Sequence, residues 1–85
     1  MRLDKYLKVS RLIKRRPVAK EACDTGRVKI NGKVSKAGAE VKADDIIEIE
    51  YASKKVRARI LDIRETVRKE EATALYEILE GAEID

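Results

Sequence analysis

The chain contains no histidine, tryptophan or phenylalanine, and it has one cysteine and one proline among its 85 residues. Without histidine it lacks the usual general base of a catalytic triad. Because Cys23 is the single cysteine, neither an internal disulfide nor a conventional zinc site is expected. These absences favour a binding module over an enzyme, and we expect no catalytic residue, no metal ion and no cofactor.

Long apolar segments are missing too. The longest uncharged stretch is far too short to span a membrane, and Arg2, Asp4 and Lys5 stand where a signal peptide would need an apolar run. A single cysteine also fits a reducing compartment. These features predict a cytoplasmic protein that does not bind membranes.

The three aromatic residues, Tyr6, Tyr51 and Tyr76, are too few to build a stacking platform for single-stranded bases. Apolar residues nevertheless make up 44% of the chain, which favours folding despite a charged fraction of 42%. A chain of this length has room for one core. We expect a single domain over residues 1–85, with a core built mainly from Leu, Ile, Val and Ala.

Charge is unevenly distributed along the chain, whose net charge is +4. Residues 1–20 carry eight basic side chains against Asp4, a local balance of +7, whereas residues 71–85 carry five acids and no base. Such segregation steers a polyanion toward the basic side, with a strong dependence on salt. Charge alone therefore favours nucleic acid as the ligand, while a merely solvated basic face stays open.

Apolar spacing predicts two N-terminal helices. Leu3, Tyr6 and Leu7 fall at the i, i+3 and i+4 positions of a short helix. A second helix is predicted to begin near Pro17, which suits the first helical turn, and to end at Gly26, which readily adopts a left-handed conformation. Its small apolar side chains, the cysteine included, are expected in the core.

Alternating apolar and polar residues then predict strands. Asn31-Gly32 is a strong hairpin signal after residues 28–30. Further strands are expected over 47–51 and 56–60, the latter with Arg57 and Arg59 pointing outward. Whether these two arginines also contact a nucleic acid stays open.

The last part of the chain has helical spacing again. Apolar residues at positions 72, 75, 76 and 79 predict an amphipathic helix that ends at Gly81. The element order predicts an α+β fold, with two N-terminal helices packed on a small, mostly antiparallel sheet plus a C-terminal helix. Within it we expect a core motif over 1–52 and a strand-and-helix extension over 53–85.

Eight basic side chains of the N-terminal third are the candidate RNA-binding residues. Arg2 and Lys5 leave one flank of the first helix. The basic triplet 14–16 lies directly before the second helix, whose N-terminal amides add positive potential. Two packed helices would hold them on one rigid surface, and arginine adds bidentate recognition of phosphate. Asp4 is expected to orient its basic neighbours or to cap the helix. The predicted set is Arg2, Lys5, Arg11, Lys14, Arg15, Arg16, Lys20 and Arg27.

The same segment resembles a known family. The run Arg2 to Leu7, the basic triplet 14–16, Gly26-Arg27-Val28 and Asn31-Gly32 follow one another as in the RNA-binding domain named after small-subunit ribosomal protein S4. Ser35-Lys36 and the stretch from Ala72 to Glu77 are similar to the small ribosome-associated heat-shock branch of that family. Within this branch the chain looks most like the RqcP group of bacterial ribosome quality-control factors.

The resemblance implies an S4-type (αL) RNA-binding fold. It also implies a factor that binds rRNA and peptidyl-tRNA on large ribosomal subunits obstructed after a stalled ribosome splits, and that supports C-terminal alanine tailing by the partner RqcH. By position, Arg2, Lys5, Arg15 and Arg16 would form the RNA-contacting core, with Lys20 and Arg27 in support. We expect the protein to act as a monomer.

Two other functions stay open from the sequence. The same fold could serve as an rRNA-binding accessory in ribosome assembly or RNA modification, with any catalysis supplied by a separate partner. Alternatively, the chain could be a protein-interaction adaptor whose basic surface binds acidic partners. Co-purified RNA distinguishes the first from quality control, and resistance to nuclease would mark the second.

Overall fold

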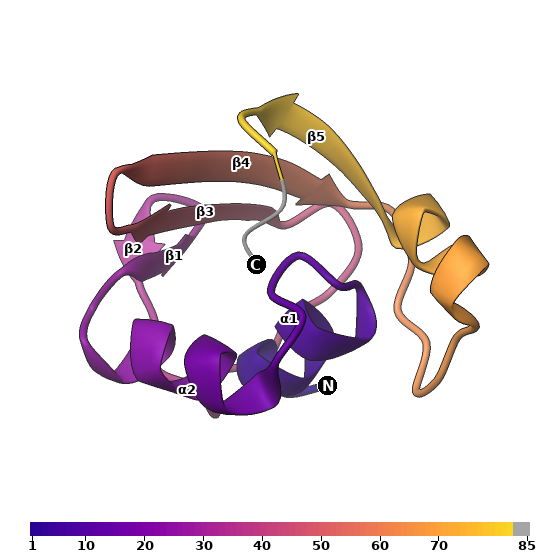
Figure 1. The fold of residues 1–85 in the computed structure, drawn as a ribbon, viewed down its shortest axis with the longest axis horizontal. Coiled ribbons are helices and arrows are strands. Elements are labelled where there is room, and N and C mark those ends of the chain that lie inside the picture. The colour runs from indigo at the N-terminus through magenta and orange to yellow at the C-terminus, as the bar shows by residue number, and fades with distance from the viewer. Residues whose placement is uncertain (83–85) are drawn as a thin grey trace.

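The computed structural model describes residues 1–82 and shows the two N-terminal helices on one face of a five-stranded antiparallel sheet, with a 3-10 helix beyond one end of the sheet (Figure 1). The strands lie in the order β2-β1-β3-β4-β5. The predicted α+β architecture is therefore confirmed. The elements are α1 Leu3–Val9, α2 Arg16–Asp24, β1 Val28–Ile30, β2 Lys33–Val34, β3 Ile46–Tyr51, β4 Lys54–Ile60, the 3-10 helix η1 Lys69–Leu75, and β5 Tyr76–Glu80.

Helix α1 ends in a tight turn. Ser10 is fully buried, and its Oγ accepts a hydrogen bond from the Leu12 N–H at 3.4 Å. Arg11 has a φ of +62°, and the Ile13 N–H donates back to the Leu7 carbonyl at 3.1 Å. The turn thus carries two further apolar side chains into the core.

Helix α2 begins and ends at the predicted signals. Pro17 lies in its first turn. Gly26 has a φ of +76°, its N–H donates to the Cys23 carbonyl at 3.1 Å, and the Arg27 N–H donates to the Ala22 carbonyl at 2.9 Å. These bonds satisfy the last carbonyls of the helix. Cys23 is fully buried, as predicted, and burial raises the pKa of its thiol to about 12.

One face of the sheet forms the core with α1 and α2. Ile47 lies opposite Ala58 and Ile49 opposite Val56, and all four are at most 1% exposed. The hairpin at Asn31-Gly32 forms as predicted, with positive φ at both residues. The period-two alternation along β3 and β4 therefore places the apolar side chains of both strands on the face that packs against the helices.

The C-terminal part differs from the prediction. Instead of one helix reaching Gly81, a 3-10 helix ends at Leu75 and the chain continues as β5. There Ile78 lies opposite Ala58 of β4, so the free edge of β4 gains a hydrogen-bonded partner. The predicted helix is wrong beyond Leu75, because this pairing outweighs the local helical spacing. Tyr76 is buried in the core.

The outer face of the sheet carries ion pairs. Arg59 Nε lies 3.4 Å from the Glu77 carboxylate, and the Arg57 guanidinium lies 4.0 Å from that of Glu80. The acidic strand β5 therefore lies beside the basic strand β4 and neutralises its outward arginines. The two remaining acids of this region, at 83 and 85, lie outside the described residues.

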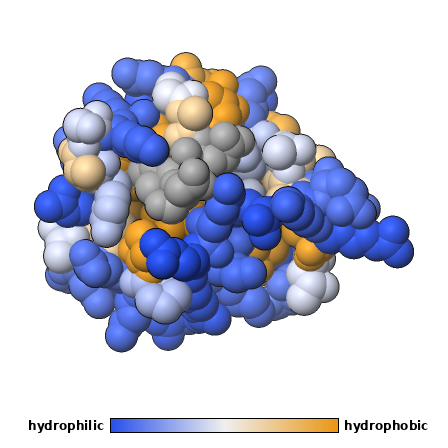
Figure 2. All heavy atoms as spheres, viewed as in Figure 1, coloured by the Kyte–Doolittle hydropathy of each residue, from blue (hydrophilic) through white to orange (hydrophobic). Residues whose placement is uncertain are grey.

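Figure 2 shows that the face viewed in Figure 1 is mainly hydrophilic, with apolar atoms in small separate patches. Over residues 1–82, no helix has the length and apolar character needed to cross a membrane. Within the same range, no group of three or more Cys, Asp or Glu side chains could hold a metal ion.

Candidate RNA-binding surface

The start of α1 is anchored to a distant part of the chain. Arg2 forms an isolated antiparallel bridge with Glu40, and the Leu3 N–H donates to the Ala39 carbonyl at 2.8 Å. Backbone hydrogen bonds therefore fix the position of Arg2 independently of its side-chain contacts.

Asp4 lies between two guanidinium groups. Its side chain is only 3% exposed, Arg2 Nε donates to Oδ1 at 3.1 Å, and Arg16 Nη2 lies 3.6 Å from Oδ2. The Lys5 backbone N–H also donates to Oδ1, at 2.9 Å. One buried carboxylate thus joins the start of α1 to the start of α2 and holds two arginines together. This arrangement, the Arg2–Asp4–Arg16 cluster, confirms that Asp4 orients its basic neighbours.

Opposing effects act on the pKa of Asp4. Burial raises it, whereas the hydrogen bond from Arg2, the charges of Arg16 and Arg2, and the Lys5 amide lower it. The lowering effects prevail, so the pKa of Asp4 lies below its usual value and the carboxylate is ionised at neutral pH. About half of each arginine side chain, 55% for Arg2 and 49% for Arg16, remains exposed to a ligand.

The cluster borders an open hollow of about 480 Å³. Pro17 and Lys20 of α2 complete its lining, so three cations and one carboxylate meet there. The N-terminal end of α2 adds a partial positive charge. An anionic group entering the hollow would meet two guanidiniums and an ammonium, which is a favourable setting for phosphate.

Two other predicted residues precede α2 in the chain and do not line this hollow. Arg15 is the exposed residue that precedes the first turn of α2, and Lys14 is exposed one position earlier. Both therefore add exposed basic residues to the segment that leads into α2.

Three predicted residues lie elsewhere. The Lys5 ammonium pairs with the Glu65 carboxylate. Arg11 follows the end of α1, in a separate cleft. Arg27 lies beyond the other end of α2, with its guanidinium 5.8 Å from the centre of the Tyr51 ring, a cation–π geometry. The eight predicted residues therefore form one principal cluster and outlying groups, not a single array.

Sequence reasoning missed residues that the fold adds to the basic surface. Lys8 and Lys69 line the same cleft as Arg11, although Lys69 is 58 positions away from Arg11 in the numbering. Glu65 was missed as well, because no local pattern indicates a pairing with Lys5. Only the packing of the loop after β4 against α1 brings these groups together.

The fold and the cluster define a small basic domain with arginines gathered at the start of two packed helices. A family model described as the S4 domain matches residues 1–47. The chain belongs to the S4 domain family.

Its relatives agree with the narrower resemblance. The chain is 58% identical over 78 residues to the RQC P-site tRNA stabilizing factor of Halalkalibacterium halodurans, covering 92% of this chain and 89% of that protein. It is 45% identical over 85 residues to the protein of the same name from Streptococcus pneumoniae, covering 100% and 97%. The trimeric structure of Vibrio cholerae heat shock protein 15 has a TM-score of 0.84 and 29% identity, covering 92% of this chain and 80% of that one. The predicted resemblance to the S4 family and its heat-shock branch is confirmed.

Proposed function

We propose that this chain is an RNA-binding factor of the large ribosomal subunit that acts in ribosome-associated quality control. It binds rRNA and peptidyl-tRNA on obstructed subunits in the cytoplasm and supports C-terminal alanine tailing by RqcH. It does so as a monomer and without catalysis of its own. The name shared by its relatives, RQC P-site tRNA stabilizing factor, supports tRNA as part of the target.

The observation that carries this proposal is the Arg2–Asp4–Arg16 cluster. Both guanidiniums are held by one buried carboxylate, so little conformational freedom is left to lose when a phosphate binds. Their exposed halves offer donors with the planar geometry that suits phosphate oxygens. We assign the principal RNA contacts to Arg2 and Arg16, and adjacent backbone contacts to Lys14, Arg15 and Lys20.

The outlying predicted residues take secondary parts in this proposal. Arg27, stacked near Tyr51, would contact RNA that extends past α2. Lys5 and Arg11 flank the other end of the surface. None of these contacts reads bases, so recognition depends on the shape and backbone of structured RNA.

The direct test is sedimentation with purified large subunits that carry peptidyl-tRNA, at physiological salt. Replacing Arg2→Ala and Arg16→Ala together removes two charge-assisted contacts of about 1.5–3 kcal/mol each, so binding should weaken roughly 100-fold or more. The matched control, Lys33→Ala with Lys36→Ala, removes the same charge from exposed positions near β2 and should bind nearly as the parent does. Unchanged sedimentation of the arginine variant would show that this surface is not the ribosome contact.

A second measurement separates quality control from the other functions. RNA recovered with the protein from cells should be large-subunit rRNA together with tRNA, and alanine tails made by RqcH should decrease when the arginine variant replaces the parent. Recovery of immature rRNA precursors would instead identify an assembly or modification accessory. Association that survives nuclease treatment would identify a protein adaptor.

A further inference from the structure

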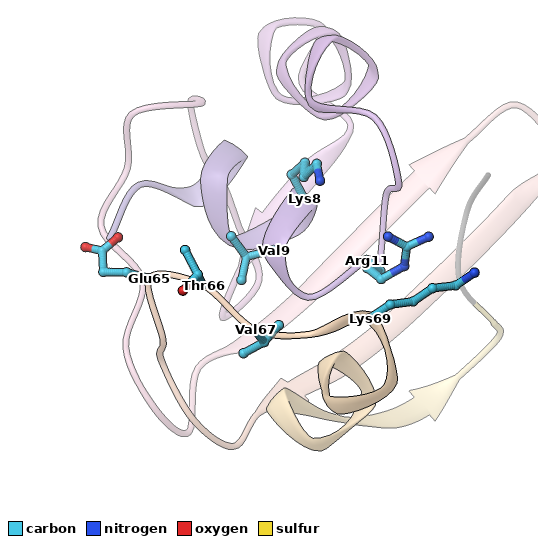
Figure 3. A pocket seen from close by; sticks show the side chains of 7 residues that line it. All are labelled: Lys8, Val9, Arg11, Glu65, Thr66, Val67 and Lys69. Atoms are coloured by element: carbon cyan, nitrogen blue, oxygen red, sulfur yellow. The ribbon is translucent and has the colours of Figure 1, made fainter.

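A second basic cleft lies at the other end of α1 from the Arg2–Asp4–Arg16 cluster (Figure 3). It has a volume of about 160 Å³. One wall is the end of α1 and the turn after it, and the other is the loop that leads from β4 to η1. Its lining consists of Lys8, Val9, Arg11, Glu65, Thr66, Val67 and Lys69.

Three of the lining side chains are cations that have no carboxylate partner in the described part of the chain. No ion pair or hydrogen bond of the Lys8, Arg11 or Lys69 side chain occurs within residues 1–82. Figure 3 shows the Arg11 and Lys69 side chains extending in the same direction, with the Glu65 carboxylate at the opposite end of the lining. The cleft therefore concentrates positive charge that no ion pair among residues 1–82 compensates.

Glu65 does not neutralise the three cations, because its carboxylate pairs with Lys5 of α1. This hydrogen bond, supported by the charge of Lys5, lowers the pKa of Glu65. The pair joins α1 to the loop and so brings the cleft's two walls together. Val9 and Val67, both packed against the core, form an apolar base between these walls.

Backbone conformation also sets the position of Arg11. Its φ of +62° is a conformation that L-residues adopt rarely, and the turn imposes it so that two apolar residues after it can be buried. Its side chain consequently leaves the turn on the side where Lys69 arrives. Lys69 is the first residue of η1, and both it and the loop before it lie beyond the residues matched by the S4 domain model, 1–47.

We infer that this cleft binds a second segment of RNA backbone, through phosphate oxygens held by Lys8, Arg11 and Lys69. The inference rests on the proposed function and extends its surface. The helix rise of about 1.5 Å per residue separates the two sites by roughly 10 Å along α1, which is far enough for different phosphates. Lys5 is then a positioning residue, because its pairing with Glu65 holds the loop that leads to Lys69.

The cleft is tested by the salt dependence of binding to large subunits that carry peptidyl-tRNA. The variant Lys8→Gln, Arg11→Gln, Lys69→Gln should bind roughly tenfold more weakly, and the slope of log affinity against log salt should become shallower by about 1 for each phosphate lost. The matched control, Lys33→Gln, Lys36→Gln, Lys42→Gln, removes equal charge from exposed positions and should keep the parental slope. A parental slope in the cleft variant, or an equal loss in the control, overturns the inference.

Two further variants show whether weaker binding comes from the position of the loop, from a general change in charge or from a loss of folding. Glu65→Gln removes one negative charge, so general electrostatics predicts tighter binding of RNA. Release of the loop instead predicts weaker binding and a shallower slope. Tighter binding would overturn the inference. Lys8→Gln with Lys69→Gln leaves the turn at Arg11 intact and should show most of the triple variant's loss while unfolding at the parental temperature.

Failure of this inference is distinguishable from failure of the proposed function. If Arg2→Ala with Arg16→Ala abolishes binding while the cleft variant binds normally, the second site alone is wrong. If the arginine variant also binds normally, neither surface is the ribosome contact, and if the parent protein itself does not bind subunits that carry peptidyl-tRNA, the proposed function is wrong.

Discussion

Replacing Asp4→Asn removes one negative charge and almost no volume from the centre of the Arg2–Asp4–Arg16 cluster. The buried carboxylate then ceases to attract two guanidiniums at 3.1 and 3.6 Å, which are left to repel each other. Breaking a fully buried pair costs about 3–5 kcal/mol, but these arginines are half exposed and solvent screens them. We therefore expect a loss of about 1–2 kcal/mol, or roughly 5–15 °C in the midpoint of thermal unfolding for a domain of this size.

The pH dependence of that difference is the decisive readout. Because the pKa of Asp4 is lowered in the folded state, its contribution is complete above the unfolded value and is lost as pH falls through the folded one. The free energies of unfolding of parent and variant should differ by the full amount at pH 7 and should converge as the pH falls below about 4. A matched Asp62→Asn variant loses only a half-exposed pair with Arg64 and should lose less than about 1 kcal/mol. A variant as stable as the parent at pH 7, or a difference that persists undiminished in acid, would refute the reasoning.

The remaining predictions concern the fold. Gly81→Ala should lower the unfolding temperature strongly, because φ is +83° and a Cβ would lie 2.0 Å from a β4 carbonyl oxygen. Gly32→Ala has the same φ but open space around the added Cβ, so it should cost about 1 kcal/mol of stability in the same thermal scan. Tyr6→Phe should lose about 1 kcal/mol in urea unfolding, because the buried hydroxyl donates to the Leu75 carbonyl at 2.7 Å, and an unchanged midpoint would contradict that bond. Cys23 should resist a thiol reagent at neutral pH until denaturant unfolds the chain, and rapid labelling of the native protein would contradict its burial.

Local patterns were enough to predict both helices, the Asn31-Gly32 hairpin and the strands β3 and β4. They failed for β5, since Leu75, Tyr76 and Leu79 have helical spacing and nothing in their neighbourhood reveals that β4 needs a partner. Strand pairing is decided by a segment some twenty positions away, as the pairing of Ala58 with Ile78 shows. Helices bond within themselves and are therefore easier to predict from sequence.

The candidate site also contains residues that local sequence predicts and residues that only distant packing brings in. Arg2, Asp4 and Arg16 were predictable, because they lie close in sequence and at the starts of adjacent helices. Lys69 was not, since it reaches Arg11 only after the loop beyond β4 folds back on α1. A count of basic residues also treats Lys5 as a free cation, although its charge is engaged by Glu65.

The hydrogen bond between the Tyr6 hydroxyl and the Leu75 carbonyl spans 69 positions of the chain. This bond affects when α1 can complete its packing during synthesis. While the polypeptide is being synthesised, α1 emerges early, yet its central tyrosine gains its final neighbours only after almost the whole chain has emerged. Closing so long a loop comes late and contributes to a slow folding step. A nascent chain stopped at residue 52 would therefore hold every residue that the S4 domain model matches, while Tyr6 still lacked its partner at Leu75.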